Sequence, residues 1–312
     1  MQTGGTMNKL VKIIERFKGK KILVLGDVML DKYIWGDVSR ISPEAPVQVV
    51  NVNKESYAPG GAANVASNIA ELGAKAWMIG VVGNDSTKTK LVNEIRKRNV
   101  NADYLVQDDE KRTILKVRVF GRNQQLLRFD YEKKGDVSIS TEEKLLNAVK
   151  KIISRVDGVI ISDYAKGTIT RGLMENLKKM CGKNDMMIIV DPKPEHKEFY
   201  KNVTLITPNS NEAKKMAGLG EEDDENVQFI GSKLLKDLNS NVLITRGEKG
   251  MSLFEKNGHV LNIPTFAKAV YDIIGAGDTS VAALALALTS GASLEESAII
   301  ANHAAGITVG KV

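Results

Sequence analysis

The stretch that decides the fold class is Lys21-Ile22-Leu23-Val24-Leu25-Gly26-Asp27, an apolar run that ends in a glycine and an acid. A short run that is apolar throughout is typical of a strand buried on both faces. Similar runs recur at Ala76–Val82, Gly158–Ser162, Met187–Val190, Val203–Thr207 and Val242–Thr245. Stretches of helical length, such as Thr141–Val156 and Asn226–Leu238, separate several of them. This alternation predicts an α/β fold with a mostly parallel central sheet and helices on both faces.

Polar residues follow most of the predicted strands. The strand ends carry Gly26-Asp27, Ser162-Asp163, Asp191-Pro192-Lys193, Pro208-Asn209 and Thr245-Arg246-Gly247. In open sheets of this kind, ligands bind outside the carboxyl ends of the strands. We therefore expect the functional site at this edge of the sheet.

Two segments depart from this pattern. Pro46–Asn53 and Thr113–Tyr131 alternate apolar and polar residues, which favours half-exposed antiparallel strands. We expect them to form a small sheet that covers the site as a lid, with strands at about residues 33–55 and 112–131 inserted in a single domain spanning residues 1–312. An exposed apolar face on this lid leads us to expect a homodimer formed through it.

Composition narrows the class of protein. The 312 residues are 43% hydrophobic and 26% charged, as in ordinary globular proteins, and the single Cys181 excludes an internal disulfide. No apolar run has the length of a membrane span, and the start lacks a signal sequence, so we expect a cytoplasmic protein without a membrane partner. The net charge of +6 is dispersed and aromatic residues make up only 5%, which argues against nucleic-acid binding.

The most informative motif is Asp272-Ile273-Ile274-Gly275-Ala276-Gly277-Asp278-Thr279, which precedes an apolar, helix-like run. Small residues at a helix start leave the first amide groups open to an anion. An acid in the same turn could accept a proton from a hydroxyl, so Asp278 and the amides of Gly275–Gly277 fit phosphoryl transfer. Taken alone, Asp278 is better explained as a helix cap, where acids are common.

A second glycine cluster, Pro59-Gly60-Gly61-Ala62-Ala63-Asn64, opens another helix-like stretch. The glycines would permit close approach of a ligand, and Asn64 could bond sugar hydroxyls; a tight turn would explain them as well. The chain has neither the Gly-x-x-x-x-Gly-Lys-Ser/Thr phosphate loop nor a Gly-x-Gly-x-x-Gly pattern after its first strand. Its three histidines lack metal-site spacing, so we predict no residue that ligates a metal directly.

Together these motifs resemble the ribokinase, or PfkB, family of carbohydrate kinases. The resemblance rests on Gly26-Asp27 through Asp31, Pro59–Asn64, Thr207-Pro208-Asn209 with Glu212, Thr245-Arg246-Gly247 with Gly250, and Gly275–Asp278. The motifs span nearly the whole chain in the family's order. The resemblance implies a ribokinase-like fold, ATP and Mg²⁺ as cofactors, and a monovalent cation such as K⁺ held by backbone carbonyls near Ile274.

The resemblance also implies roles for individual residues. Asp278 matches the catalytic base, and Gly275, Ala276 and Gly277 match the anion hole. Residues implied to bind the nucleotide, its phosphates or their Mg²⁺ are Asn209, Glu212, Thr245, Gly247 and, near the adenine, Asn302. Residues implied to bind the sugar are Asp31, Gly60, Gly61 and Asn64.

Within the family, the chain is most similar to the kinases of D-glycero-D-manno-heptose 7-phosphate, found alone or as one half of a bifunctional enzyme of ADP-heptose and lipopolysaccharide precursor synthesis. This similarity rests on Gly26–Asp31, Ser39–Val47 and Arg122–Leu126, and is extended by Ser162–Gly167 and Asp191–Lys193. The implied reaction moves the γ-phosphoryl of ATP to the anomeric hydroxyl and gives the 1,7-bisphosphate. Arg122 and Lys193 are the candidates for binding the phosphate of the sugar.

Two alternatives stay open at this stage. A kinase of the same family could act on another sugar or sugar phosphate, such as ribose or a fructose phosphate. A protein of the same fold could also bind nucleotide or sugar without turnover. Asp278 and the glycines before it argue against the second alternative. Turnover measured across a panel of sugars would distinguish the first alternative from a heptose-7-phosphate kinase.

Overall fold

The apolar runs form a central sheet of eight strands. The computed structural model describes residues 3–122, 124–220, 226–267 and 275–310, and it orders this sheet β14-β13-β12-β11-β10-β9-β1-β4. Neighbouring strands from β4 to β12 are parallel, whereas β12, β13 and β14 pair antiparallel. The strands are β1 (Lys21–Gly26), β4 (Lys75–Ile79), β9 (Gly158–Ser162), β10 (Met187–Asp191), β11 (Leu205–Ile206), β12 (Asn241–Thr245), β13 (Met251–Phe254) and β14 (Val260–Ile263). The predicted fold class is confirmed.

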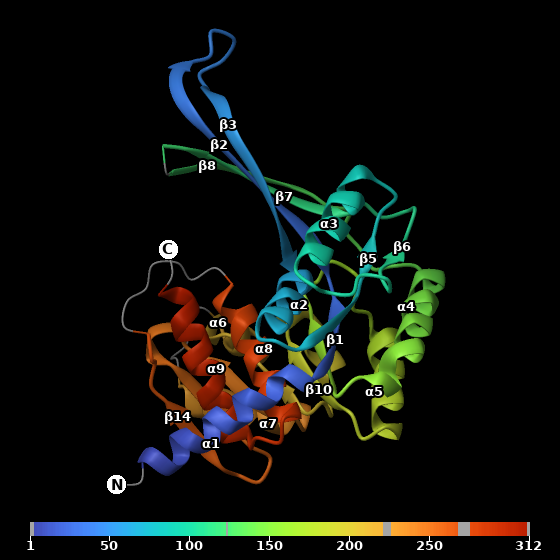
Figure 1. The fold of residues 1–312 in the computed structure, drawn as a ribbon, viewed down its shortest axis with the longest axis vertical. Coiled ribbons are helices and arrows are strands. Elements are labelled where there is room, and N and C mark those ends of the chain that lie inside the picture. The colour runs from blue at the N-terminus through green and yellow to red at the C-terminus, as the bar shows by residue number, and fades with distance from the viewer. Residues whose placement is uncertain (1–2, 123, 221–225, 268–274, 311–312) are drawn as a thin grey trace.

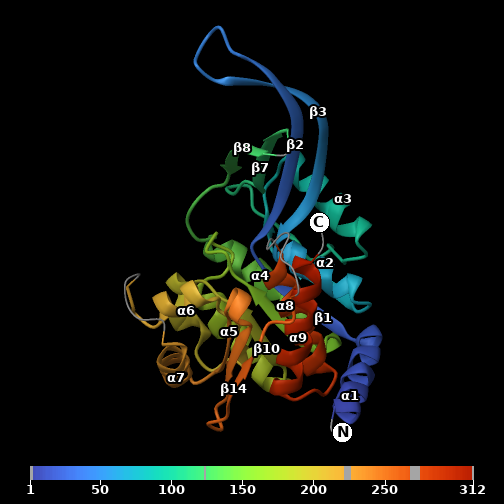
Figure 2. The same ribbon diagram turned by 90° about the vertical axis from the view of Figure 1, so that its left-hand side faces the viewer.

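Helices cover both faces of this sheet, as Figures 1 and 2 show. Alternate residues of β1 divide between two apolar cores: Ile22 and Val24 lie in one, and Leu23 and Leu25 in the other. The first core contains residues of α1 (Thr3–Glu15), α2 (Ala62–Glu71), α3 (Ser86–Lys97), α8 (Ala276–Thr289) and α9 (Leu294–Val309). The second contains residues of α4 (Ile139–Ile152), α5 (Arg171–Lys183), α6 (Ser210–Met216) and α7 (Val227–Leu238). Burial on both faces explains why the parallel strands are apolar throughout.

A second sheet, the lid, stands on one edge of the body (Figure 1). It has four strands in the order β3-β2-β7-β8. They are β2 (Val28–Ile41), β3 (Gln48–Gly61), β7 (Ile114–Gly121) and β8 (Gln124–Tyr131). The first two reach closer to the body than the alternating pattern indicated, because Val28–Leu30 are buried in the core and show no alternation. A short parallel pair, β5 (Val81–Val82) with β6 (Val106–Gln107), lies beside the central sheet.

Two other features bear on the class of protein. Cys181 is buried on α5, as expected for a small apolar residue, and burial raises the pKa of its thiol to about 12. Among the helices that the structure describes, none combines the length and the apolar character needed to cross a lipid bilayer.

Candidate active site

Asp278 lies in the first turn of α8, at the carboxyl edge of the central sheet. The helix begins at Ala276, and Gly275 before it has φ 79°, a left-handed conformation that glycine adopts without strain. Asn64 of α2 donates to one carboxylate oxygen of Asp278 at 2.6 Å, and the Tyr164 hydroxyl donates to the other at 3.1 Å. The carboxylate is thus fixed from two sides in front of the start of the helix.

Burial raises the pKa of Asp278, and the two hydrogen bonds partly oppose this rise. The charge of Asp31 also raises this pKa, in keeping with the nearness of the lid to Asp278. A carboxylate with a raised pKa is a stronger base than an ordinary aspartate. Burial, followed by the charge of Asp278, raises the pKa of Tyr164 well above its usual value, so Tyr164 keeps its proton and donates.

A cavity of about 220 Å³ opens in front of Asp278. Its lining is Tyr164, Asp191, Lys193, Thr207, Asn209, Glu212, Thr245, Gly275, Gly277, Asp278 and Val281. A Cβ atom built on Gly277 would meet no other atom within 4 Å, so this glycine faces open space. The start of α8 therefore leaves room for an anionic group against its first amides.

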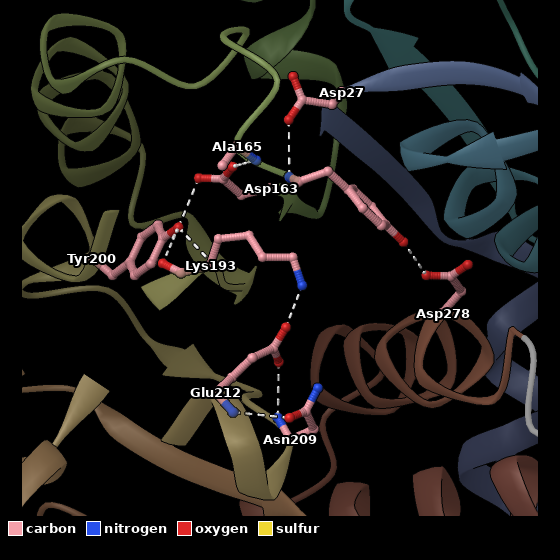
Figure 3. Close-up of polar contacts among 9 residues, drawn as sticks. Asp27, Asp163, Ala165, Lys193, Tyr200, Asn209, Glu212 and Asp278 are labelled. Atoms are coloured by element: carbon pink, nitrogen blue, oxygen red, sulfur yellow. Dashed lines mark hydrogen bonds and ion pairs between the residues drawn. The ribbon is translucent and has the colours of Figure 1, made fainter. Parts of the chain in front are cut away.

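The start of α6 and the segment after β10, which carries Lys193, form the far wall of the cavity (Figure 3). Asn209 caps α6: its side chain accepts from the Glu212 amide at 2.9 Å, and Glu212 accepts from the Asn209 amide at 3.0 Å. The other oxygen of Glu212 pairs with the ammonium of Lys193. Burial lowers the pKa of Lys193, but the hydrogen bond and charge of Glu212 outweigh it, and the pKa is raised. Lys193 is therefore a charged group whose partner is already a carboxylate.

The carboxylates around this cavity repel one another. Burial raises the pKa of Asp191 well above its usual value, and the charges of Asp278 and Glu212 raise it further. A divalent cation in the cavity would relieve this repulsion, so the residues present fit Mg²⁺. Within the described part of the chain, no three His, Cys, Asp or Glu side chains are grouped closely enough to hold a metal ion. Mg²⁺ that keeps several of its waters is compatible with such a site.

The loop that carries Tyr164 is held by a buried acid. Asp27, which is 0% exposed, accepts from the backbone amides of Tyr164, Lys166 and Thr168 at 2.9, 3.0 and 3.1 Å. Asp163 accepts from the Ala165 amide and the Tyr200 hydroxyl, each at 2.7 Å (Figure 3). These contacts position Tyr164 next to Asp278.

The lid contributes the remaining predicted sugar-binding residues. Asp31 of β2 forms an ion pair with Arg118 of β7 at 2.6 Å. A Cβ on Gly60 would lie 2.3 Å from the Asp31 carboxylate, so the glycine makes room for that side chain. Gly61 has φ 56° and caps α2, which carries Asn64.

Besides Ala276, Asn64 and the lid residues Asp31, Gly60 and Gly61, three more predicted residues do not line the first cavity. Gly247 lines a second cavity of about 500 Å³, whose lining shares Asn209 and Thr245 with the first. The Asn302 side chain donates to the Pro264 carbonyl at 2.6 Å and lines neither cavity. Arg122 is exposed in the turn between β7 and β8, with φ 48°. Ile274, named for the monovalent cation, lies outside the described residues.

Four residues that line the first cavity were not predicted: Tyr164, Asp191, Thr207 and Val281. Tyr164 follows β9 and Asp191 is the last residue of β10, and at these strand ends the sequence indicated ligand contacts without indicating which side chain faces the site. Thr207 follows β11 in the same way. Val281 is one of many apolar residues of α8, and its sequence context carries no signal of a site.

Comparison with known proteins agrees with this geometry. Residues 19–312 match the model of the pfkB family of carbohydrate kinases. The chain is 42% identical over 303 residues to the bifunctional protein HldE of Sulfurimonas denitrificans, covering 97% of this chain and 63% of that protein. It is 45% identical over 297 residues to HldE of Shewanella amazonensis, covering 95% and 61%. The chain thus spans less than two thirds of these relatives.

Solved structures share the fold. Phosphofructokinase-2 from Escherichia coli in complex with fructose-6-phosphate has a TM-score of 0.77 and 22% identity, covering 93% of this chain and 94% of that one. Arabidopsis thaliana ribokinase complexed with ribose and ATP has a TM-score of 0.72 and 21% identity, covering 94% and 93%. With the family match over almost its whole length, the chain belongs to the pfkB family of carbohydrate kinases.

Proposed function

We propose that the chain transfers the γ-phosphoryl group of ATP to the anomeric hydroxyl of D-glycero-D-manno-heptose 7-phosphate, giving the 1,7-bisphosphate. The observation that carries the chemistry is the Asp278 carboxylate, held by Asn64 and Tyr164 in front of the glycine-rich start of α8. The heptose assignment is supported by the motifs resembling heptose-7-phosphate kinases and by 40–45% identity to HldE proteins. As a step in ADP-heptose and lipopolysaccharide precursor synthesis, the reaction would take place in the cytoplasm.

In this proposal Asp278 accepts the proton of the sugar hydroxyl as that oxygen attacks phosphorus. The amides of Gly275, Ala276 and Gly277, with the dipole of α8, stabilise the negative charge on the transferring group. Lys193 can neutralise phosphate charge from the opposite wall of the cavity. Mg²⁺, when bound near Asp191, Asn209 and Glu212, would offset charge on the ATP phosphates.

The nucleotide would extend from this cavity past Thr245 toward Gly247, which line the neighbouring cavity. On the sugar side, Asp31 and Asn64 have free acceptor and donor capacity for hydroxyls. Gly60 and Gly61 let the lid strand pass close to them. Roles for Asn302 at the adenine, Arg122 at the sugar phosphate and a monovalent cation are further parts of this proposal, drawn from the family resemblance.

We also propose that residues 1–312 act as one kinase domain, with the lid as an insertion, and that two copies associate through the lid. Leu127, Phe129 and Tyr131 alternate along β8 and are 56%, 37% and 40% exposed. They share a face with Val117 and Val119 of β7, opposite which Phe129 and Leu127 lie in register. An exposed apolar stripe of this kind fits an identical stripe on a second copy.

ADP formation with Mg²⁺ tests the reaction across heptose 7-phosphate, fructose phosphates, ribose and a control without sugar. We expect turnover selective for the heptose phosphate, and loss of kcat by about 10²- to 10⁴-fold in Asp278→Asn. Turnover with a different sugar would retain the chemistry and reject the heptose assignment. ATP binding without transfer to any sugar would support a binding protein instead.

A further inference from the structure

One face of the lid is directed at the catalytic carboxylate. In the strand register Lys116 of β7 lies opposite Asp31 of β2 and opposite Asp130 of β8, so the three side chains share that face. The ammonium of Lys116 lies 5.7 Å from the ring centre of Tyr164, whose hydroxyl bonds Asp278. The Tyr164 ring therefore lies between Lys116 and the reacting end of the site.

This region carries more positive than negative charge. Three carboxylates each hold one cation: Asp31 pairs with Arg118 at 2.6 Å, Asp130 with Arg128 at 2.7 Å, and Glu132 with Lys166 at 2.8 Å. Lys116 is the fourth cation of the group, and it forms no hydrogen bond or ion pair with any residue that the structure describes.

The environment of Lys116 disfavours its charge. Lys116 is partly buried, and burial, followed by the nearby charge of Arg128, lowers its pKa. A cation that is removed from water without a partner is costly unless a ligand supplies the opposite charge. Such a residue in a purely structural role would be expected to be paired or solvated.

A second polar group in the same region also lacks a partner. One carboxylate oxygen of Glu132 is buried without a hydrogen-bond donor in the described part of the chain, while its other oxygen holds Lys166. A ligand with hydroxyl groups could supply that donor. A phosphorylated sugar has both groups that this region lacks, because its phosphate is an anion for Lys116 and its hydroxyls are donors for Glu132.

We propose that Lys116, with Arg128 beside it, binds the phosphate at the end of the sugar remote from the accepting hydroxyl. The inference rests on the proposed function and assigns the part of that site which selects a phosphorylated substrate. Lys193 also approaches the Tyr164 ring, at 5.5 Å, but Glu212 already neutralises it on the nucleotide side. Arg122 lies in the exposed turn at the far end of β7 from Ile114.

The test compares a phosphorylated sugar with its free counterpart: heptose 7-phosphate against heptose. Lys116→Met should raise KM for the phosphorylated sugar about 10- to 100-fold, the scale of one lost charged contact, and leave kcat/KM for the free sugar nearly unchanged. Lys116→Arg should restore most of the affinity. The matched control is Lys54→Met, an exposed lid lysine that lies over Trp35.

Equal losses with both sugars, or no loss with either, would overturn the inference. If Arg122→Gln loses affinity only for the phosphorylated sugar and Lys116→Met does not, Arg122 in the turn binds the phosphate. This result would also overturn the inference. If the wild-type protein uses another sugar phosphate, the proposed function is wrong, and the same comparison with that sugar and its free form still tests Lys116. A wild-type protein that accepts only unphosphorylated sugars would reject both.

Discussion

The two halves of the site are built from different kinds of structure and carry opposite charge. The half around Asp278 lies at the ends of buried parallel strands, and its acids Asp27 and Asp163 are buried and bonded to backbone amides. The lid half is a mixed sheet in which β2 pairs parallel with β7, and in the cluster around Lys116 four cations accompany three acids. Groups fixed by the core suit the chemical step, whereas groups on a separate sheet can change substrate choice without changing the core.

This contrast predicts which substitutions separate stability from activity. In the core half, most side chains near the reaction also support the fold, as the three amides on Asp27 illustrate. Gly277 differs from these residues, because a Cβ atom added to it would meet no neighbouring atom within 4 Å. A side chain at this position would therefore not disturb the packing of the fold. Gly277 offers the largest effect on activity for the smallest expected cost in stability.

Gly277→Ala should lower kcat on the order of 10²-fold, because the added methyl group fills the space against the first amides of α8. Alanine is the better helix former, so the free energy of unfolding should stay the same or rise by up to about 1 kcal/mol. Steady-state kinetics and urea denaturation measure the two quantities. Gly182→Ala in α5, where a Cβ also meets nothing within 4 Å, is the matched control and should change only stability. Full activity in Gly277→Ala would contradict the anion site.

Tyr164→Phe should have a smaller effect, about 3- to 30-fold in kcat, the scale of one hydrogen bond to a charged group. The variant removes a donor that lowers the pKa of Asp278, so this pKa should rise. Because the base must be deprotonated to act, the acidic limb of the kcat/KM profile should move to higher pH. Tyr104→Phe, a partly buried tyrosine packed elsewhere in the core, serves as the control. A profile that does not move would show that Tyr164 does not act on the base.

The same contrast explains what the sequence could predict. The apolar runs from Lys21 to Thr245 predicted the parallel strands correctly, because burial on both faces leaves a strong local pattern. Strands β13 and β14 were missed, since short antiparallel strands at the sheet edge carry less of that pattern. Asp278 and Gly275–Gly277 were predicted together because the whole group lies within one helix turn.

The lid side of the site could not be predicted in the same way. The bond between Asn64 and Asp278 spans 214 positions, and the ion pair of Arg118 with Asp31 spans 87. That the carboxylates beside Lys116 are paired with other cations depends on strand register, which the sequence does not state. Arg122 stood out by its motif, whereas Lys116 stands out only once the carboxylates beside it are seen to be paired with other cations.

The smallest expected effect concerns the support of the core half. His196 bonds the buried carboxylate of Asp163 at 2.6 Å, and this hydrogen bond, opposed by burial and reinforced by the charge of Asp163, raises the pKa of His196. A histidine whose pKa is raised by folding adds stability that is complete below its unfolded pKa of about 6.5 and is lost as pH rises through the folded value. The free energy of unfolding should therefore fall by up to about 1 kcal/mol more in the wild-type protein than in His196→Gln as pH rises from about 6 to 9.

Urea denaturation across this pH range measures the difference. The control is His259→Gln, because the His259 ring lies 3.9 Å from Glu295 in a half-exposed pair. Parallel curves for the wild-type protein and His196→Gln would mean that the Asp163 network holds its loop without the charge on His196, through the Tyr200 hydroxyl and the Ala165 amide alone.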